Sequence, residues 1–252
     1  MQRRQFLTIT GGLGLGTALG VLPTYAQAQD VLTIRWFGHL AFEFRGGGLR
    51  LFSHPFRPAG CTAGMRLPKP IEADYVLISS RLWDEGYLDA LPQEMQVLAE
   101  PGIYNLKGTT FQGIAVPHDR LGGRRFGENV MWRWQQSGIN ILHMGGAAAE
   151  LTPEQRILVG RPDILIIPVG GSDKAYNTQE AWQMIQTLNP RVVIPSYYRT
   201  SKAAETCPQK GLDEFLSLAP REKTARVKTP DYSLRARDLP ETTVFRILQL
   251  IQ

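Results

Sequence analysis

The residue types best suited to chemistry follow one short apolar run. Tyr75–Ser79 is apolar with β-branched residues, and this composition predicts a buried strand. The run ends in polar residues, and two adjacent carboxylates, Asp84 and Glu85, come shortly after it. In α/β proteins the loop at the carboxyl end of a strand commonly carries the chemistry. A carboxylate pair in such a loop suits oxygen-preferring cations such as magnesium, calcium or manganese.

Histidines supply the second set of candidate ligands. The chain has four, His39, His54, His118 and His143, and each lies near the end of an expected strand. Imidazole is a common ligand of transition metals, so one interpretation is a metal site built from these residues. The other is that two of them hydrogen-bond to the backbone inside a cleft. A metal site needs a ligand number and a geometry that residue types alone do not give.

The elements that position these residues begin as a β-meander, in which Gly46-Gly47-Gly48 marks a turn. We expect strands at Val31–Phe37, Ala41–Arg45, Leu49–Ser53, Gln96–Ala99, Ile103–Leu106, Thr110–Pro117, Asn129–Gln136 and Ile139–His143. Asp84–Leu91 is expected to form a short helix, and residues 54–72 are expected to form a loop because they are rich in Pro and Gly.

After His143 the pattern changes to alternating helices and strands. Thr152-Pro153 predicts a helix start, with threonine as the N-cap and proline at the first helical position. The further elements expected are strand Ile164–Pro168, helix Thr178–Leu188, strand Val192–Pro195 and a closing strand Thr242–Leu248. Strands followed by alternating helices and strands suit a sheet sandwich flanked by helices.

Six segments in order resemble the lactonase-like, metal-dependent hydrolase branch of the metallo-β-lactamase superfamily. They are Ile34–His39, Leu51–Phe56, Ile114–His118, Ile141–Gly146, Asp163–Gly171 and Ile194–Thr200. The resemblance implies the α/β class and an αββα sandwich, in which two mixed sheets are flanked by helices. It also implies hydrolysis by a metal-bound hydroxide, which forms because the metal lowers the pKa of its bound water to around 7.

The resemblance also shows which metal ligands this chain lacks. Laid on the family's Thr-His-x-His-x-Asp-His motif, Ser80, Leu82 and Glu85 replace the three histidines, and Asp84 remains. Leucine is the most damaging of these changes, because an alkyl side chain has no lone pair to donate.

Three further positions depart from the family, and one is kept. Gly146 replaces a bridging aspartate, Tyr197 replaces the final histidine, and His54 replaces an aspartate, whereas His118 matches a metal-binding histidine. The residues of this vestigial cleft are therefore Ser80, Leu82, Asp84, Glu85, His118, Gly146 and Tyr197.

Two functions fit these departures. In the first, which we favour, the protein is a pseudoenzyme that has lost its dinuclear metal site, needs no cofactor, and binds a small molecule or an envelope protein. In the second, it is a metal-dependent hydrolase with a rebuilt, mononuclear site for a divalent metal. The candidate ligands for that site are Asp84, Glu85, His118 and His54.

Charge suggests how the first function would work. Without a cation, Asp84 and Glu85 repel each other, so one protonates or finds a basic partner. The resemblance places Arg81, Arg199 and the arginines at positions 120, 124 and 125 around the cleft mouth. We hypothesise that guanidinium groups, Arg81 and Arg199 foremost, replace the metal charge and leave a cleft for a carboxylate or phosphate.

The amino terminus predicts export. Arg3-Arg4 is a twin-arginine pattern, an apolar Gly-rich run follows, and Ala26-Gln27-Ala28 supplies a cleavage site. We therefore expect residues 1–28 to be a twin-arginine signal peptide and 29–252 to be the domain. The run is too short and glycine-broken for a comfortable membrane span. The destination would be the periplasm, or the thylakoid lumen in a cyanobacterium.

Composition limits the possible partners. The net charge is +5, and it falls to about +3 when Arg3 and Arg4 are removed with the signal peptide. That charge is small and dispersed, which argues against nucleic-acid binding. The two cysteines, Cys61 and Cys207, do not have a C-x-x-C spacing. In an oxidising compartment they form either one disulfide or two unpaired thiols, and the sequence leaves both open.

Overall fold

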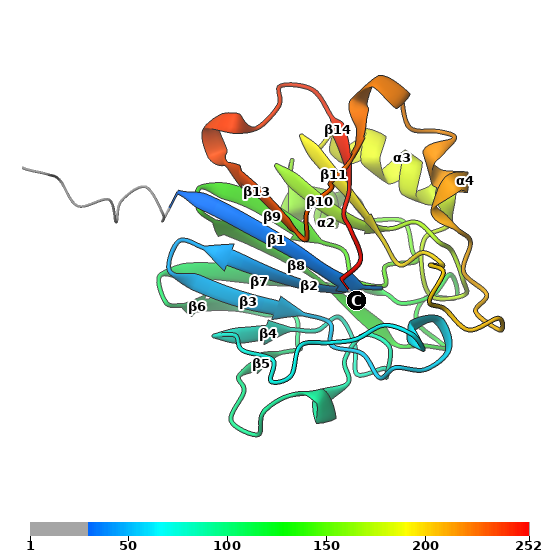
Figure 1. The fold of residues 1–252 in the computed structure, drawn as a ribbon, viewed down its shortest axis with the longest axis horizontal. Helices are drawn as coiled ribbons and strands as arrows, with labels where there is room; N and C mark the ends of the chain where they lie inside the picture. The colour runs from blue at the N-terminus through cyan, green and yellow to red at the C-terminus, as the bar shows by residue number, and fades with distance from the viewer. Residues whose placement is uncertain (1–29, 252) are drawn as a thin grey trace, which may run out of the picture.

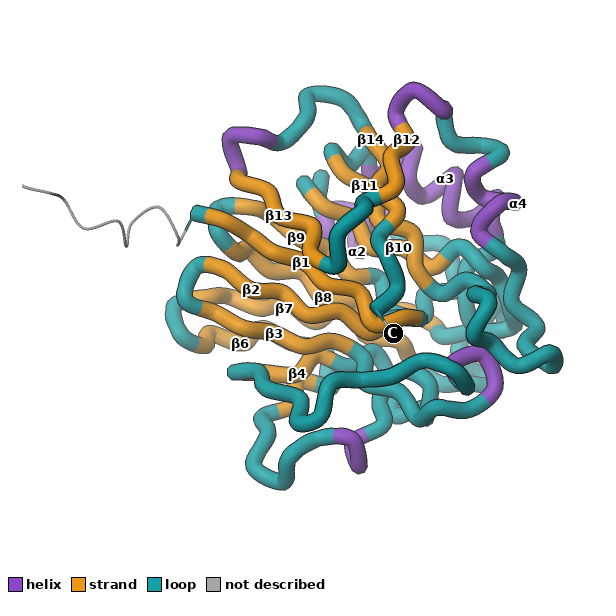
Figure 2. The backbone as a smooth tube through the Cα atoms, viewed as in Figure 1, coloured by secondary structure: helices purple, strands orange, loops and turns teal. Residues whose placement is uncertain are grey.

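Two β-sheets facing each other form the centre of the protein in the computed structural model, which describes residues 30–251 (Figures 1 and 2). The strands of the first sheet are β1 (Val31–Gly38), β2 (Ala41–Gly46), β3 (Leu49–Ser53), β4 (Tyr75–Leu77), β5 (Val97–Leu98) and β13 (Asp231–Arg235). Their order across the sheet is β13-β1-β2-β3-β4-β5, so a late strand pairs antiparallel with the first.

The second sheet is larger and mixed. Its strands are β6 (Gly102–Leu106), β7 (Thr109–Pro117), β8 (Glu128–Gln136), β9 (Ile139–His143), β10 (Ile164–Pro168), β11 (Val192–Ser196), β12 (Thr224–Arg226) and β14 (Val244–Ile247). The order is β12-β14-β11-β10-β9-β8-β7-β6, antiparallel from β6 to β9 and parallel from β9 to β12.

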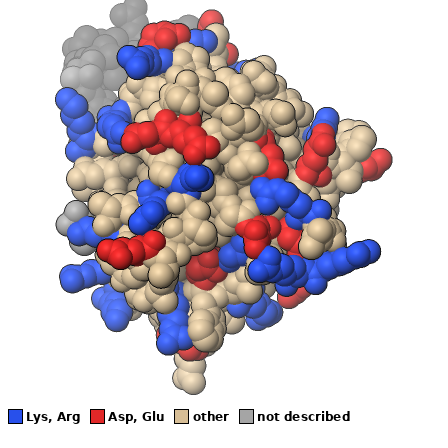
Figure 3. Space-filling view, turned by 90° about the vertical axis from the view of Figure 1, so that its right-hand side faces the viewer, with Lys and Arg blue, Asp and Glu red and all other residues tan. Residues whose placement is uncertain are grey.

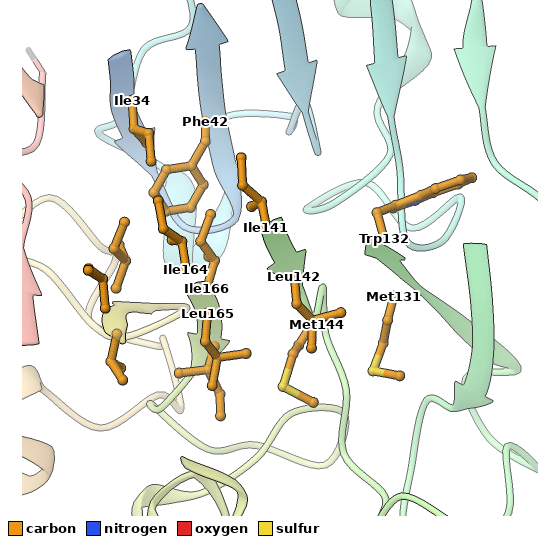
Figure 4. Close-up of a cluster of buried hydrophobic side chains, with 14 of the residues drawn as sticks. Ile34, Phe42, Met131, Trp132, Ile141, Leu142, Met144, Ile164, Leu165 and Ile166 are labelled. Carbon is orange, nitrogen blue, oxygen red and sulfur yellow. The ribbon is translucent and has the colours of Figure 1, made fainter. Parts of the chain in front are cut away.

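The main core lies between the two sheets. Ile34 of β1 and Phe42 of β2 point toward Ile141 of β9 and toward Ile164 and Ile166 of β10 (Figure 4), and all five side chains are fully buried. Successive strand residues point to opposite faces of a sheet, which is why only alternate residues of β1 enter this core. Burying these apolar side chains is the main force that holds the sheets together.

Helices cover the outer face of the second sheet. They are α2 (Pro153–Val159), α3 (Thr178–Leu188) and α4 (Leu212–Leu216). Trp182 of α3 stacks on Phe245 of β14, and Phe215 of α4 meets the same ring edge-on. Thr152 and Asn177 cap α2 and α3, and each forms a capping box with the third helical residue.

Loops cover the outer face of the first sheet. Phe52 of β3 and Val76 of β4 point away from the main core and pack with Phe56, Met65 and Ile71 of the following loop. The only helical turns described near this face are the 3-10 turns Gly60–Thr62 and Leu88–Ala90. The predicted α/β class and the two mixed sheets are confirmed, and the helices gather on the second sheet.

One expectation about an element was wrong, and three elements were not predicted. Asp84–Leu91 does not form one helix: the chain turns at Leu82, whose carbonyl accepts from Glu85 N and Gly86 N, and only Leu88–Ala90 is helical, in 3-10 form. A Cβ at Gly86 would collide with the backbone oxygen of Ser80, so glycine allows this tight return. The carboxyl-terminal elements β12, β13 and α4 were not anticipated.

A disulfide joins Cys61 and Cys207, which are separated by 146 residues in sequence. It decides the question that the sequence left open, and it ties the loop after β3 to the segment before α4. The expected signal peptide, residues 1–28, lies outside the described residues. Among residues 30–251, no helix combines the length and apolar character that crossing a bilayer requires.

Candidate functional site

The site residues meet where strands of both sheets end. His39 follows β1, His54 follows β3, Asp84 and Glu85 lie after β4, and His118 follows β7. The same end of the molecule receives His143 from β9, Lys174 from the loop after β10 and Tyr197 from the end of β11. These eight residues come from seven separated stretches of the chain.

Three of these residues have unusual backbone conformations. His39, His54 and Tyr197 have φ angles of 52°, 48° and 53°, in the left-handed region that side chains other than glycine rarely adopt. Such conformations cost of order 1–3 kcal/mol each and persist where the surroundings impose them, commonly at functional sites. The fold therefore spends stability to aim these side chains into the site.

Lys174 holds both carboxylates. Its Nζ lies 2.6 and 2.8 Å from the two carboxylate oxygens of Asp84 and 2.9 Å from Oε1 of Glu85. Burial lowers the pKa of Lys174, but the charges of Glu85 and Asp84 outweigh burial and raise it above its ordinary value. The Lys174 side chain is therefore protonated, and its ammonium lies between the two carboxylates.

Glu85 is fully buried and has a partner for each oxygen. Ser79 Oγ donates to its Oε2 at 2.7 Å, and His118 Nε2 lies 3.2 Å from its Oε1, the oxygen that also accepts from Lys174. Burial raises the pKa of this carboxyl. Lys174 and His118 lower it by more than burial raises it, so the pKa lies well below its usual value. Glu85 is therefore a buried anion.

Asp84 lies nearer to solvent, with a side chain 30% exposed. His39 Nε2 is 3.4 Å from its Oδ2, and the His39 ring lies 4.2 Å from the ring of Tyr197. Burial raises the pKa of Asp84, but His39 and Lys174 bring it below its ordinary value. Burial raises the pKa of Tyr197, so its phenol stays neutral and lies 3.4 Å from Ser172 Oγ.

His54 and His143 form a separate, uncharged pair whose rings lie 4.2 Å apart. His143 Nδ1 accepts from Gly145 N and its Nε2 lies 3.2 Å from Leu40 O, so both of its nitrogens are used. Neither nitrogen of His54 has a hydrogen-bond partner among the described residues. Burial lowers the pKa of His54 to about 3, so this ring stays neutral.

A cavity of about 470 Å³ opens above Asp84 and Lys174. Its lining residues are Arg57, Ala59, Gly60, Cys61, Trp83, Asp84, Phe126, Ser172, Asp173, Lys174, Tyr197, Pro208 and Gln209. Figure 3 shows the face on the right-hand side of Figure 1, where acidic and basic side chains are interspersed. A cavity of this volume is in the size range of small-molecule sites.

The comparisons with known proteins agree with this arrangement. Residues 33–197 match the model of the beta-lactamase superfamily domain. The chain belongs to that superfamily. A metal-dependent hydrolase of Thermococcus onnurineus is 27% identical over 198 residues, covering 68% of this chain and 86% of the relative. One from Methanopyrus kandleri is 24% identical over 239 residues, covering 77% of this chain and 100% of the relative.

Solved structures give the same family and fold. A proposed Zn-dependent hydrolase of the metallo-beta-lactamase superfamily from Thermotoga maritima is 25% identical, with a TM-score of 0.69. The similarity covers 87% of this chain and 100% of that one. A metallo hydrolase of Ignicoccus hospitalis, 18% identical with a TM-score of 0.59 over 81% and 99% of the two chains, shares the fold.

The superfamily implies a metal, and the side chains of this member do not fit one. Among residues 30–251, no group of three or more His, Cys, Asp or Glu side chains is arranged to hold a metal ion. The two carboxylates that would be its hardest ligands both accept hydrogen bonds from Lys174. A dication in the same place would have to displace a buried ammonium.

Gly146 shows that the space for a bridging ligand is also filled. A Cβ at this position would lie 2.5 Å from Nε2 of His118 and 2.8 Å from Oε2 of Glu85. The backbone N–H of Gly146 donates to Oδ1 of Asn129 at 2.7 Å, which fixes the glycine against both groups. An aspartate at this position would have no room unless His118 and Glu85 moved.

Ser80 and Leu82 shape the turn that presents the carboxylates. Leu82 N donates to Ser80 Oγ at 3.3 Å, and both side chains are half-buried. The sequence predicted that Asp84, Glu85, His118, Gly146 and Tyr197 lie in one cleft, and the structure brings these five residues together. His54 lies beside His143 instead of among the carboxylates.

The cation that contacts Asp84 and Glu85 is Lys174, whereas the sequence suggested arginine. Arg81 pairs with Glu100 on the surface, and Arg199 reaches only the backbone oxygen of Glu205, at 3.5 Å. Lys174 was missed because several basic residues follow strands, and the sequence does not show which of them reaches Asp84. One feature pointed toward it: it follows a strand, like the other site residues, in the segment Gly170–Lys174.

Proposed function

We propose that this member of the superfamily binds a small molecule in the cavity above Asp84 and has replaced the hydrolytic metal centre with the ammonium of Lys174. The observation that carries the proposal is the contact of one Nζ atom with three oxygens of Asp84 and Glu85. A lysine ammonium supplies charge, but unlike a metal ion it cannot activate water by coordination.

The charges support binding without hydrolysis. Asp84 and Glu85 are ionised and Lys174 is protonated, so none of the three is poised to exchange a proton near neutral pH. An efficient general acid or base has a pKa near the working pH. Tyr197 is not poised to exchange a proton either, because burial raises the pKa of its phenol and keeps it neutral.

We also propose export, as the amino-terminal pattern suggests. The disulfide between Cys61 and Cys207 supports it, because disulfides persist in oxidising compartments such as the periplasm. Cys61 also lines the cavity, so the disulfide fixes one of its walls.

The second candidate function is a metal-dependent hydrolase with a rebuilt site. The relatives from Thermococcus onnurineus and Methanopyrus kandleri carry that activity in their names. Within the described part of the chain, both nitrogens of His54 and Nδ1 of His118 are buried without hydrogen-bond partners, and such atoms are available as ligands. This function requires Lys174 to leave the carboxylates.

Elemental analysis of the exported protein separates the two functions. The protein is purified without chelators, equilibrated with zinc, manganese and magnesium, and dialysed before the metal content per chain is measured. We expect no stoichiometric metal, and no difference between the parent and Asp84→Ala. About one equivalent of a transition metal that Asp84→Ala removes would overturn the proposal and establish the hydrolase instead.

A further inference from the structure

The loop that follows β3 helps to form a second cavity of about 830 Å³, which we call the loop cavity. Its walls come from residues 56–69 and from residues 87–90, and both stretches are loop apart from short 3-10 turns (Figure 2). A cavity of this volume is in the range of small-molecule sites, about 300–1,000 Å³. None of the four candidate metal ligands lines it. The loop cavity is therefore separate from the carboxylate site, although Arg57 lines both cavities.

The floor of the loop cavity is apolar. Phe56 and Met65 line it and are buried in the small core on the outer face of the first sheet. Leu67 and Ala90 also line it, pack against that core and stay partly exposed. Covering partly exposed apolar surface is favourable, because it removes that surface from water. These four residues, which we call the apolar floor, therefore suit a hydrocarbon body.

Backbone contacts fix the two walls relative to each other. Tyr87 N donates to Pro55 O at 2.8 Å, so the second wall is bonded to the residue that precedes the first. Arg57 N donates to Trp83 O at 2.6 Å, and the disulfide anchors the first wall at Cys61. A cavity with fixed walls loses little conformational freedom when a ligand enters, which favours binding.

The rim of the loop cavity is cationic. Arg57, Arg66 and Lys69 line it and are exposed, and their side chains form no hydrogen bond or ion pair with any residue among 30–251. The guanidinium of Arg57 lies 4.5 Å from the centre of the Trp83 ring, and this contact leaves its N–H donors unused. Asp89 is the one carboxylate of the lining. Three cations against one carboxylate leave the rim with an excess of positive charge.

The cationic rim and the apolar floor alternate along the chain. Arg57 follows Phe56, and Arg66 lies between Met65 and Leu67. A molecule that rests its chain on the floor therefore meets cations beside it. Tyr87 also lines the loop cavity, and within the described part of the chain its hydroxyl has no hydrogen-bond partner. That hydroxyl is a further donor for an anionic oxygen.

We propose that the loop cavity binds an amphipathic anion, a single hydrocarbon chain that ends in a carboxylate or a phosphate. The chain packs on the apolar floor, and Arg66 and Lys69 bind the head group. A guanidinium pairs with either head through two parallel N–H···O bonds. This site is independent of the carboxylate site, so the proposal stands for either of the two functions above.

The test uses probes that share a ten-carbon chain and differ in the head group. Decanoate, decyl phosphate, 1-decanol and decyltrimethylammonium are titrated into the full-length protein by calorimetry, each below the concentration at which it forms micelles. We expect the two anions to bind about tenfold more tightly than 1-decanol, because hydrogen bonds between charged groups are the stronger ones. Equal or tighter binding of 1-decanol or of decyltrimethylammonium would overturn the proposal, as would no binding of decanoate at millimolar concentration.

Two further probes separate the head group, the chain and a membrane. Acetate supplies the head group without the chain, and it should not bind at millimolar concentration. Acetate binding as tight as that of decanoate would contradict a role of the apolar floor. Vesicles of phosphatidylglycerol present the anionic head as a surface. If the protein sediments with these vesicles but does not bind decanoate, the cations dock on a membrane and the proposal of a single-chain ligand is wrong.

Charge variants assign the head group to the rim. Arg66→Gln and Lys69→Gln each remove one cation, and each should weaken decanoate binding about threefold to tenfold without changing that of 1-decanol. Arg124→Gln and Lys228→Gln are matched controls, because both residues are exposed cations outside the loop cavity, and neither change should alter the affinity. The variants should fold like the parent, since the exposed rim cations have no partner to lose among residues 30–251. Unchanged decanoate affinity in the variant that carries both rim changes would refute the proposal.

Two other variants should shift the affinity in opposite directions. Asp89→Asn removes the carboxylate of the rim, so it should tighten decanoate binding about twofold to threefold. Leu67→Asn makes the floor polar, so it should weaken decanoate and 1-decanol alike, by about tenfold. Weaker decanoate binding in Asp89→Asn, or unchanged binding in Leu67→Asn, would contradict the assignment of rim and floor.

Discussion

The exchange of Lys174 for methionine tests whether the ammonium has taken the place of a metal. Methionine keeps much of the side-chain length and removes the charge, so Asp84 and Glu85 lose the cation they share. Removing one partner of a buried ion pair costs about 3–5 kcal/mol, because the other charge stays buried without compensation. We expect the lower end of that range, since Asp84 is 30% exposed and can be rehydrated in part.

Thermal unfolding measures this cost directly. For a domain of this length 1 kcal/mol shifts Tm by about 2–4 °C, so we expect Lys174→Met to lower Tm by roughly 6–12 °C at pH 7. Lys107→Met is the matched control: its ammonium pairs with Asp74 at the surface, where ion pairs contribute little. The control should shift Tm much less.

A divalent cation should then stabilise the variant and leave the parent unchanged. With the ammonium gone, Asp84 and Glu85 present an oxygen-rich pair that suits magnesium or manganese. A ligand at 100 times its Kd stabilises a folded protein by about 2.7 kcal/mol, so millimolar metal should restore part of the lost Tm. An unchanged Tm in Lys174→Met, or equal stabilisation of the parent by metal, would refute the replacement of metal by lysine.

Three further predictions concern buried titratable groups, the disulfide and Gly146. Lowering the pH from 8 to 5 should reduce the free energy of unfolding by about 2 kcal/mol through His54 alone. The imidazole of the unfolded chain, with a pKa of 6.5, gains a proton over this range, whereas the buried imidazole, with a pKa of about 3, does not. Chemical denaturation along a pH series measures this loss. A second loss should begin below pH 4.5, where the unfolded Glu85 protonates and the folded one, with its lowered pKa, does not. Replacing both Cys61 and Cys207 by serine should lower the unfolding free energy by up to about 5 kcal/mol in the chain-entropy account, measured in urea, and an unchanged midpoint would contradict it. Gly146→Ala should cost about 1–3 kcal/mol by overpacking against His118 and Glu85, whereas Gly211→Ala, which meets nothing within 4 Å, should be tolerated.

Local pattern predicted most of the fold. The apolar run at Ile164–Pro168 and the helix at Thr178–Leu188 have the predicted bounds, because a strand buried on both faces and a helix with an Asn cap leave clear patterns. The strand Asp231–Arg235 leaves no such pattern: it is polar, half-exposed and at the sheet edge. Its pairing with Val31–Gly38 depends on contacts that span the whole chain, including the bidentate bond from Arg35 to Asp231.

The site was predicted in part for the same reason. Asp84 and Glu85 could be placed because a strand precedes them, and His118 because it ends another strand. The partner of the carboxylates could not be placed, since several basic residues follow strands and only the packed fold shows which one reaches them. Arg120, for example, bonds to Glu180 and to backbone oxygens of Ser172 and Ala175.

The sequence also could not show which ring nitrogens of each histidine are hydrogen-bonded. His143 has backbone partners for both nitrogens and His54 has none, although both rings are fully buried. That difference depends on where Leu40 O and Gly145 N point, and these are features of backbone geometry. One of the two interpretations offered for the histidines, backbone hydrogen bonding inside the cleft, thus holds for His143.

The lysine at position 174 and the glycine at position 146 are compatible with each other, and each depends on the other. A dication supplies two positive charges beside Asp84, Glu85 and a bridging aspartate, whereas the ammonium of Lys174 supplies one. An aspartate at position 146 would add a third carboxylate to a buried cluster with one cation, and burying an uncompensated charge is costly. The glycine removes that anion, and His118 and Glu85 fill the space. Reversing either position alone therefore creates a charge or a packing defect: methionine at 174 leaves two carboxylates without a cation, and aspartate at 146 leaves three on one. A divalent cation held weakly by Asp84 and Glu85 needs only the loss of the Lys174 ammonium, whereas a dinuclear centre would require both changes at once, together with donors at Ser80 and Leu82.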